Sequence, residues 1–351
     1  MDIFTAAPHH DVLMLVIQVA TLLIVARVCG FAARSLGQSA VAGEILAGVA
    51  LGPSFLSTLV PAIGHWVIPQ NEVQGYLLEL IGLLGAMFLL VITGLETDLP
   101  LIRRHAKTAV GIASGGLILP LVSGFLLAFY LPDFLLADPD RRLVFSLFVA
   151  TAMSVSAIPV IAKVLIDLKL MRRDLGQTIM AAGMIDDTVA WALLSVVLGL
   201  ASGGVVTAGT VLFSAGKILA FMLLSFTLGR WLLKHALDFV QDRVVGPDRL
   251  LSLVVAAAFV WGAVAQAIDI EAVLGAFVVG ILFGTMRRLP NDVVRKLESV
   301  AIGVFAPVFF AIAGLKVHLP SLLTPELFGI TLLIFAVAVL SKMVGVYAGD
   351  A

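Results

Sequence analysis

Two adjacent aspartates, Asp186 and Asp187, lie in the segment AAGMIDDTVAWALL with apolar residues on both sides. A charge near the middle of a membrane-spanning helix costs about 2.5–3.5 kcal/mol on insertion scales, so such a residue is interpreted first as functional. Neighbouring helix positions point about 100° apart, because a turn takes 3.6 residues. We therefore expect the two carboxylates to face different surroundings and to have different roles.

The chemistry that this pair predicts is competition between a proton and a cation. Close carboxylates repel each other and burial disfavours charge, so we expect at least one of them to hold a proton near neutral pH. A hard monovalent cation could replace that proton, because oxygen ligands suit both. The alternative is a structural network in which neighbouring donors satisfy both aspartates.

Lys342, in VAVLSKMVGVYAG, is the natural counter-charge for the pair because it falls well inside the last apolar run. If Lys342 pairs with Asp186, then Asp187 is left to titrate and to bind the ion. The alternative is a lysine whose stem extends to the cytoplasmic interface, since it lies only about nine residues from the end of the chain.

Hydroxyl side chains and a proline interrupt another apolar run, TAMSVSAIPVIAKVL, in which Thr151, Ser154 and Ser156 precede Pro159. Proline frees a backbone carbonyl one turn earlier. Broken helices near the midplane of secondary transporters offer such carbonyls and hydroxyls to coupling ions. These four residues are therefore candidate broken-helix ligands, and a tolerated proline kink is the alternative.

These residues need membrane-spanning helices to hold them. The 351 residues are 61% hydrophobic and 13% charged, with a mean hydropathy of +1.12. Soluble domains have roughly 45–50% apolar and 25% charged residues. The apolar runs recur between short polar breaks, and each can cross the roughly 30 Å of hydrocarbon that needs about 20 helical residues. The predicted fold class is an all-α membrane protein, a polytopic helical bundle.

Apolar runs and helix breakers predict eleven helices in this bundle. They span about 11–33, 40–56, 76–95, 105–131, 142–167, 174–201, 207–236, 249–267, 271–286, 296–315 and 325–348. Glu44 falls in the second run, whose small residues permit close helix approach, and we interpret it as structural. No phosphate loop, metal cluster or nucleophile motif is found, so no cofactor, soluble-type enzyme chemistry or nucleic-acid partner is indicated.

Lysines and arginines concentrate in alternate loops. One set of loops holds Arg34, Arg103, Arg104, Lys107, Lys169, Arg172, Arg173, Lys234, Arg243, Arg249, Arg287, Arg288, Arg295 and Lys296, and the other holds Arg141, Arg142 and Lys316. Short loops rich in these residues stay on the cytoplasmic side. We therefore expect the N-terminus outside and the C-terminus in the cytoplasm, in a bacterial plasma (inner) membrane.

Several segments together resemble the monovalent cation:proton antiporter family, in its branch with paired aspartates. In chain order they are GQSAVAGEILAGVALGP, FLLVITGLETDL, TAMSVSAIPVIAKVL, GMIDDTVAW, EAVLGAFVVGILFG, PVFFAIAGLKVHL and LSKMVGVYAG. They run through nearly the whole chain and are specific in this order. Ser39 stands where the family usually has proline.

The resemblance implies an inverted-repeat fold in which two broken helices cross at the midplane, and a core domain that moves against a dimerisation domain. It therefore implies a homodimer. It makes Asp187 the carboxylate that binds the monovalent cation and the proton, and Asp186 its partner. Lys342 resembles the lysine that pairs with the first aspartate, and Thr151 and Ser154 resemble part of the first broken helix.

One transmembrane transporter domain is expected over residues 1–351. Its predicted parts are a first inverted repeat (1–201), a linking helix (207–236) and an incomplete second repeat (249–351). In the family's order a second broken helix and a final helix follow the run that carries the lysine, so the resemblance implies a C-terminally truncated chain.

The predicted function is secondary active antiport of Na⁺ or K⁺ against protons, and not an enzymatic reaction. One alternative is an inactive fragment or membrane scaffold of such a transporter. An intramembrane aspartyl protease also uses two buried aspartates, but these must come from different helices to flank one water. Because Asp186 and Asp187 are consecutive, the sequence disfavours the protease.

Overall fold

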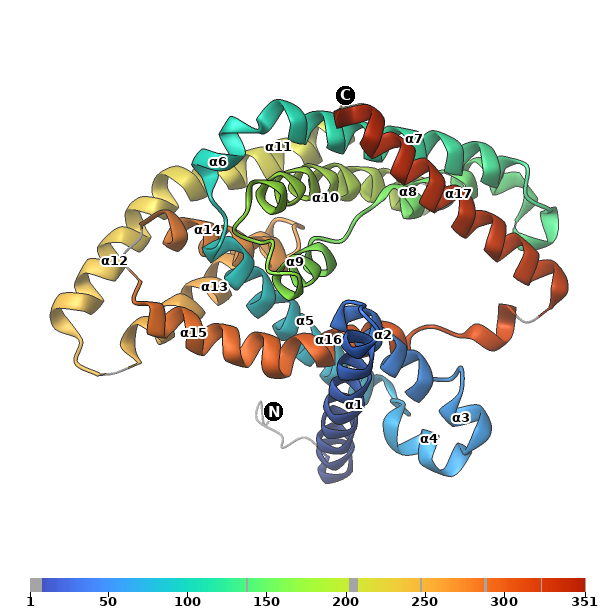
Figure 1. Ribbon diagram of the computed structural model, residues 1–351, viewed down its shortest axis with the longest axis horizontal. Coiled ribbons are helices and arrows are strands. Elements are labelled where there is room, and N and C mark those ends of the chain that lie inside the picture. Colours follow the sequence, from blue (N-terminus) through green and yellow to red (C-terminus); the bar gives the residue numbers. More distant parts are fainter. Residues whose placement is uncertain are drawn as a thin grey trace, which may run out of the picture. The chain divides into compact units, whose positions relative to one another are not determined.

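The computed structural model describes residues 8–136, 138–201, 208–246, 248–286, 289–322 and 324–350, and these residues form helices and connecting segments without a β-strand (Figure 1). The helices are α1 (His9–Ser35), α2 (Ala40–Leu51), α3 (Leu56–Leu59), α4 (Pro61–Val67), α5 (Glu72–Leu95), α6 (Leu99–Arg104), α7 (Ala106–Phe129), α8 (Arg142–Ser154), α9 (Ile158–Asp167), α10 (Asp174–Ala201), α11 (Ala208–Leu224), α12 (Arg230–Arg243), α13 (Arg249–Ala267), α14 (Ala272–Met286), α15 (Asn291–Val300), α16 (Ala306–Leu315) and α17 (Pro325–Asp350).

The predicted class, a polytopic all-helical membrane bundle, is confirmed. Within the described residues, eight helical segments are long and apolar enough to cross a membrane, and α2 and α14 are shorter apolar helices. A further helix, α10, has 28 residues and carries the aspartate pair. Each of the eleven predicted runs contains one helix or two successive helices. The first residue of the predicted linking helix, Thr207, lies outside the described residues.

The second predicted run is shorter in the structure than in the prediction. Helix α2 ends at Leu51, where the prediction placed the end near residue 56. The backbone of Gly52 is extended (φ −79°, ψ −168°) because the following Pro53 disfavours a helical conformation there. The short helices α3 and α4 follow in a stretch that the prediction left without helix.

The predicted run over 142–167 divides into α8 and α9, separated by the non-helical residues 155–157. Pro159 is the second residue of α9, where the absence of its N–H leaves no helical hydrogen bond unmade. The helix is therefore broken immediately before the proline, and the last carbonyls of α8 have no helical donor after them.

The contacts within the chain divide it into two compact units. Unit 1 comprises Met1–Glu96, Lys163–Lys169 and Leu232–Leu323. Unit 2 comprises Thr97–Ala162, Leu170–Trp231 and Thr324–Ala351. The boundary falls inside α9, so the beginning of this helix belongs to unit 2 and its end to unit 1. The predicted inverted repeats remain a prediction.

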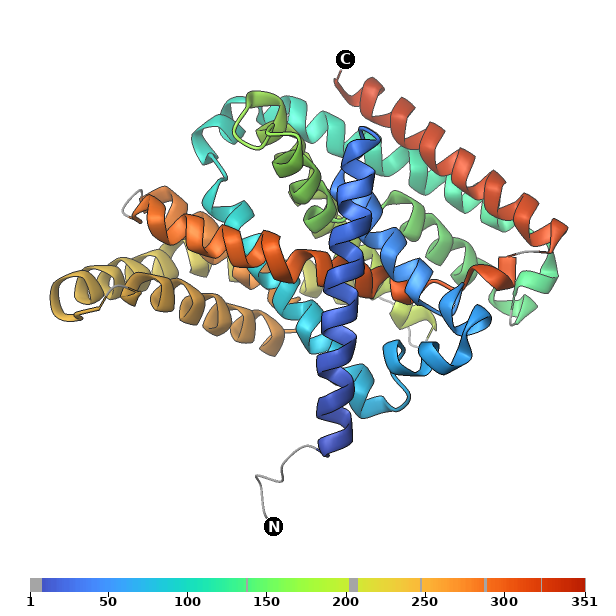
Figure 2. The same ribbon diagram turned by 60° about the horizontal axis from the view of Figure 1, so that its bottom comes forward.

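Helix α17 packs along α7 in unit 2, and Figure 2 shows the two ribbons side by side. Glycines permit this close approach. A Cβ atom on Gly115 of α7 would lie 2.0 Å from the carbonyl oxygen of Gly345 of α17, and a Cβ on Gly345 would lie 2.2 Å from that of Gly115. Gly111 and Gly349 meet in the same way one turn away. Such small-residue pairs let membrane helices touch through their backbones.

Helix α2 packs between α1 and α16 in unit 1. A Cβ atom on Gly43 would lie 2.2 Å from the carbonyl oxygen of Cys29, and one on Gly48 would lie 1.9 Å from that of Ala311. Buried apolar residues, among them Leu22 and Ala47, fill the space beside these contacts. One face of α2 is therefore buried against α1 and α16, while Leu46 on another face is 63% exposed.

Candidate functional site

Asp186 and Lys342 come together in unit 2, although 156 residues separate them in the sequence. Lys342 Nζ, on α17, lies 3.2 Å from Asp186 Oδ2, on α10. Asp186 is buried, with 5% of its surface exposed, and the side chain of Lys342 is 26% exposed. The lysine thus places an opposite charge beside a buried carboxylate, which would be costly without a partner.

Lys342 has a second partner at the break between α8 and α9. Its ammonium group donates a hydrogen bond of 2.7 Å to the backbone carbonyl of Ser154, the last residue of α8. Carbonyls at the end of a helix lack intrahelical donors, and the helix dipole favours a positive charge there. The broken helix thus supplies a ligand to the lysine.

Among the predicted broken-helix ligands, Ser156 reaches the pair through its side chain. Its hydroxyl donates to Asp186 Oδ2 at 3.2 Å. The hydroxyls of Ser154 and Thr151 instead donate within α8, to the carbonyls of Thr151 at 2.9 Å and Leu147 at 2.8 Å. Pro159 lies beyond the break, in the first turn of α9. The structure therefore brings Ser156, the Ser154 carbonyl, Asp186 and Lys342 together.

The two oxygens of Asp186 have unequal surroundings. Oδ2 accepts hydrogen bonds from both Lys342 and Ser156. Oδ1 is buried and has no hydrogen-bond partner among the described residues. A buried carboxylate oxygen without a donor is costly, and a proton or a cation on it would remove that cost.

Asp187 is half-buried on α10, directly after Asp186. Neighbouring positions of a helix point about 100° apart, and the different roles of the two carboxylates remain a prediction. In the described part of the chain, no group of three or more histidine, cysteine or acidic residues is arranged to hold a metal ion.

A fully buried lysine is absent from the site residues that the sequence predicted. Lys163, on α9, is 0% exposed, and its Nζ lies 3.0 Å from Asp167 Oδ1 in unit 1. The signal in the sequence was a lysine and an aspartate four residues apart in an apolar run, a spacing that places both on one helix face.

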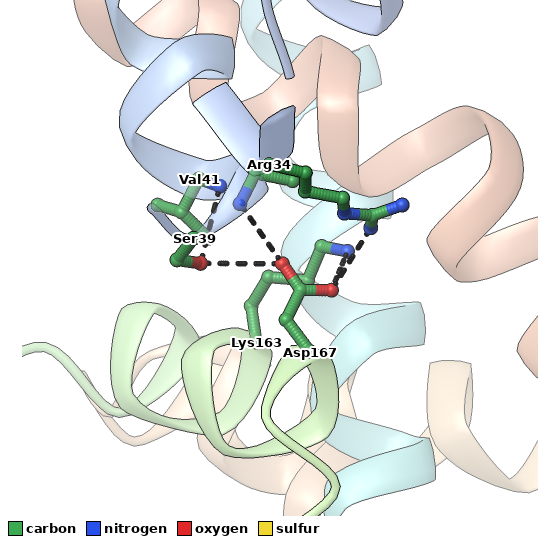
Figure 3. Close-up of polar contacts among 6 residues, drawn as sticks. Arg34, Ser39, Val41, Lys163 and Asp167 are labelled. Atoms are coloured by element: carbon green, nitrogen blue, oxygen red, sulfur yellow. Dashed lines mark hydrogen bonds and ion pairs between the residues drawn. The ribbon is translucent and has the colours of Figure 1, made fainter. Parts of the chain in front are cut away.

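Asp167 also accepts hydrogen bonds from residues at the connection between α1 and α2 (Figure 3). Its Oδ1 also accepts from Arg34 Nη2 at 3.1 Å. Its Oδ2 accepts from Ser39 Oγ and from the backbone N–H of Ala40, both at 3.2 Å. The carboxylate thus sits at the N-terminus of α2, where the helix dipole stabilises a negative charge. Asp167 has donors on both oxygens, whereas Asp186 has donors on one.

A broken helix beside buried opposite charges is a feature of secondary transporters, and this is the class of protein that the fold and the site define. The model of the family described as "Sodium/hydrogen exchanger, transmembrane" matches residues 19–351. The chain belongs to the sodium/hydrogen exchanger family. The resemblance drawn from the sequence motifs is therefore confirmed.

Curated relatives match most of this chain. Cation/H(+) antiporter 20 of Arabidopsis thaliana is 31% identical over 346 residues, which cover 95% of this chain and 40% of that protein. Na(+)/H(+) antiporter NhaS4 of Synechocystis is 29% identical over 345 residues, which cover 96% of this chain and 82% of that protein. K(+)/H(+) antiporter 1 of Saccharomyces cerevisiae is 28% identical over 340 residues, which cover 93% of this chain and 38% of that protein. The chain thus spans about 40% of the length of the Arabidopsis relatives that it matches.

A solved structure supports the fold. The sodium proton antiporter MjNhaP1 from Methanocaldococcus jannaschii superposes with a TM-score of 0.68, at 19% sequence identity. The superposition covers 97% of this chain and 79% of that chain. The helical architecture is therefore that of an antiporter of known structure.

Proposed function

We propose that the protein exchanges a monovalent cation, Na⁺ or K⁺, for protons across a membrane, as a secondary active antiporter. The observation that carries this proposal is the incomplete coordination of Asp186. One of its oxygens is bound by Lys342 and Ser156, and the other is buried without a donor. A second carboxylate follows directly at Asp187, so two acids stand side by side in the sequence at this site.

In the proposed cycle, Asp187 binds the cation and exchanges it for a proton, with Asp186 as its partner. A proton on Asp187 removes the negative charge that attracts the cation, so the two compete for one carboxylate. Lys342 compensates Asp186 while the cation is absent. A pair that accepts two protons against one monovalent cation would move net charge during each cycle.

The broken helix contributes oxygen ligands in this proposal. Ser156 and the carbonyl of Ser154 already contact the Asp186–Lys342 pair. The hydroxyl oxygens of Thr151 and Ser154 lie in the last turn of α8 and keep lone pairs that can accept. The break that Pro159 imposes is what leaves the last carbonyls of α8 available to cations.

The integral membrane location follows from the helices and the family. We propose the finer placement, a bacterial inner membrane with the N-terminus outside, from the distribution of lysine and arginine. Two of the arginines that define it, Arg287 and Arg288, lie outside the described residues. We also propose a homodimer, on the resemblance to the family. Accessibility labelling of single cysteines in the loops of intact cells tests the orientation, and native mass spectrometry tests the dimer.

Proteoliposomes with a trapped pH indicator test the proposed exchange. Addition of Na⁺ or K⁺ outside should drive proton movement, and comparison of the two salts shows which ion is carried. Asp187→Asn should abolish this movement. A matched control is Glu79→Gln, since Glu79 is an exposed carboxylate that pairs with exposed Lys316 at 2.7 Å. Exchange that persists in Asp187→Asn would contradict the assignment, and absence of exchange in the wild type would contradict the function.

A further inference from the structure

Glu44 is a buried acid to which the proposed exchange assigns no task. It lies on α2 in unit 1 and is 1% exposed. Its Cγ would lie only 3.3 Å from a Cβ atom on Gly30 of α1, so its side chain fills the space that this glycine leaves. Its Oε2 is buried and has no hydrogen-bond partner among the described residues. An ionised carboxylate in such a place would be strongly disfavoured, and the protonated acid would cost much less free energy.

The basic side chains of Lys163 and Arg34, which act on Glu44, are hydrogen-bonded to another acid, Asp167. Lys163 and Arg34 both donate to Asp167 Oδ1, at 3.0 and 3.1 Å. Asp167 receives two more donors from Ser39 and Ala40, at the N-terminus of the helix that carries Glu44 one turn later (Figure 3). Asp167 therefore keeps its charge with four donors, while Glu44, on the same helix as two of those donors, has none on Oε2.

The charged groups around Glu44 come from two elements besides its own. Helix α1 carries Arg27, Cys29 and Arg34, and α9 carries Lys163 and Asp167. Four of these, Lys163, Asp167, Arg27 and Arg34, act electrostatically on Glu44. Helices α3 and α16, which also pack against α2, contain no titratable side chain. Because Lys163 is fully buried, acts on Glu44 and has a flexible stem, a change of partner would not take its ammonium group through water.

We propose that Glu44 is a second proton-binding site, separate from the aspartate pair. It holds a proton while Lys163 is bound to Asp167, and it takes Lys163 as its partner when the proton leaves. The transfer of Lys163 would remove one of the four donors of Asp167 and loosen the attachment of α9 to α2. Helix α9 begins two residues after Ser156, which contacts Asp186, so this site would make that attachment depend on pH.

Infrared spectroscopy of the purified protein reads this proton directly, because a protonated carboxyl group has a carbonyl stretching band that a carboxylate lacks. The wild type near neutral pH should show such a band that Glu44→Gln loses and Glu79→Gln keeps. Glutamine has the shape of the neutral acid, so the variant should fold. Identical carboxylic-acid bands in the wild type and in Glu44→Gln at every pH would overturn the proposal.

Two variants with opposite expected effects test the exchange of Lys163. Lys163→Met removes the cation, so the Glu44 band should persist to a pH higher by about one unit or more. Asp167→Asn leaves Lys163 with Glu44 as its acidic partner, so the band should disappear at a lower pH than in the wild type. An unchanged midpoint in either folded variant would refute the role of Lys163. The bands require no transport, so this result stands or fails independently of the proteoliposome assay.

Discussion

Two lysine–aspartate pairs among the described residues have nearly equal distances, and in each the aspartate side chain is 7% exposed. Lys163 lies 3.0 Å from Asp167 in unit 1, and Lys342 lies 3.2 Å from Asp186 in unit 2. The acids differ in what surrounds them, because Asp167 has four donors on two oxygens and Asp186 has two donors on one. A saturated carboxylate has no place for a further ligand, whereas Asp186 has one.

The lysines differ as well. Lys163 is completely buried and bonds within its own helix, but Lys342 is partly exposed and bridges two helices and a carbonyl. A lysine beside an acid therefore does not by itself indicate an exchange site. Our proposal rests instead on the incomplete coordination of Asp186 beside a second acid, Asp187.

The largest effect expected from this comparison is on stability. Asp167→Ala should lower the free energy of unfolding by about 3 kcal/mol or more, because the Ser39 hydroxyl and the Ala40 N–H lose their acceptor even when Lys163 turns to Glu44. Asp186→Ala should cost clearly less, since Lys342 keeps the Ser154 carbonyl as a partner and its side chain is only partly buried. Thermal unfolding in detergent measures both. Equal losses for the two variants would remove the distinction between a saturated and an open pair.

The next largest effect on stability is expected at the contact between α7 and α17. Gly345 lies at this contact, one turn after Lys342 on α17. Gly345→Ala would bring a methyl group to 2.2 Å from the Gly115 carbonyl oxygen and push the helices apart. The expected cost is about 1–3 kcal/mol, together with reduced exchange. Gly329→Ala in the same helix is a matched control, since a Cβ atom there meets nothing within 4 Å. Equal stability and equal exchange in Gly345→Ala and Gly329→Ala would mean that the contact between α7 and α17 does not position Lys342.

Removal of the counter-charge should change the pH dependence of exchange before it abolishes exchange. Lys342→Ala withdraws the cation that stabilises the charged form of Asp186, so protons should compete with the cation up to a higher pH. We expect the pH profile of exchange to move upward by about one unit or more. Proteoliposome assays over a pH series measure the profile. A profile identical to that of the wild type would exclude Lys342 from the mechanism.

The smallest effect is expected at an exposed pair. Lys316 and Glu79 lie 2.7 Å apart in unit 1, and both side chains are more than half exposed. Solvent and salt screen such pairs, so Glu79→Gln should change stability by no more than about 1 kcal/mol. Thermal unfolding at low and high salt checks this value. A loss as large as that of Asp167→Ala would mean that burial does not decide the energy of these pairs.

The sequence predicted the helices well because a membrane demands long apolar runs, and every interruption is visible as a polar or glycine–proline break. It also identified Asp186 and Lys342, since charges are rare inside such runs. Helix α2 ends earlier than predicted, because Pro53 disfavours a helical conformation at Gly52. Local rules of this kind are readable from the chain.

The hydrogen-bond partners of each acid could not be predicted from the sequence. The Lys163–Asp167 spacing was visible, but its bonds to Arg34 and Ser39 join positions more than 120 residues apart. Similarly, the hydroxyl of Ser156 reaches Asp186 because α8 ends at Ser154, whereas hydroxyls earlier in α8 donate to its own carbonyls. Such contacts depend on how distant helices pack, which no local pattern specifies.

The most direct test of the central claim is proton release on cation binding by the purified protein. When Na⁺ or K⁺ is added in weakly buffered detergent solution, the wild type should release protons, and Glu79→Gln should do the same. Asp187→Asn should release none, because it lacks the carboxylate for which the two ions compete. Undiminished release from Asp187→Asn would contradict the account.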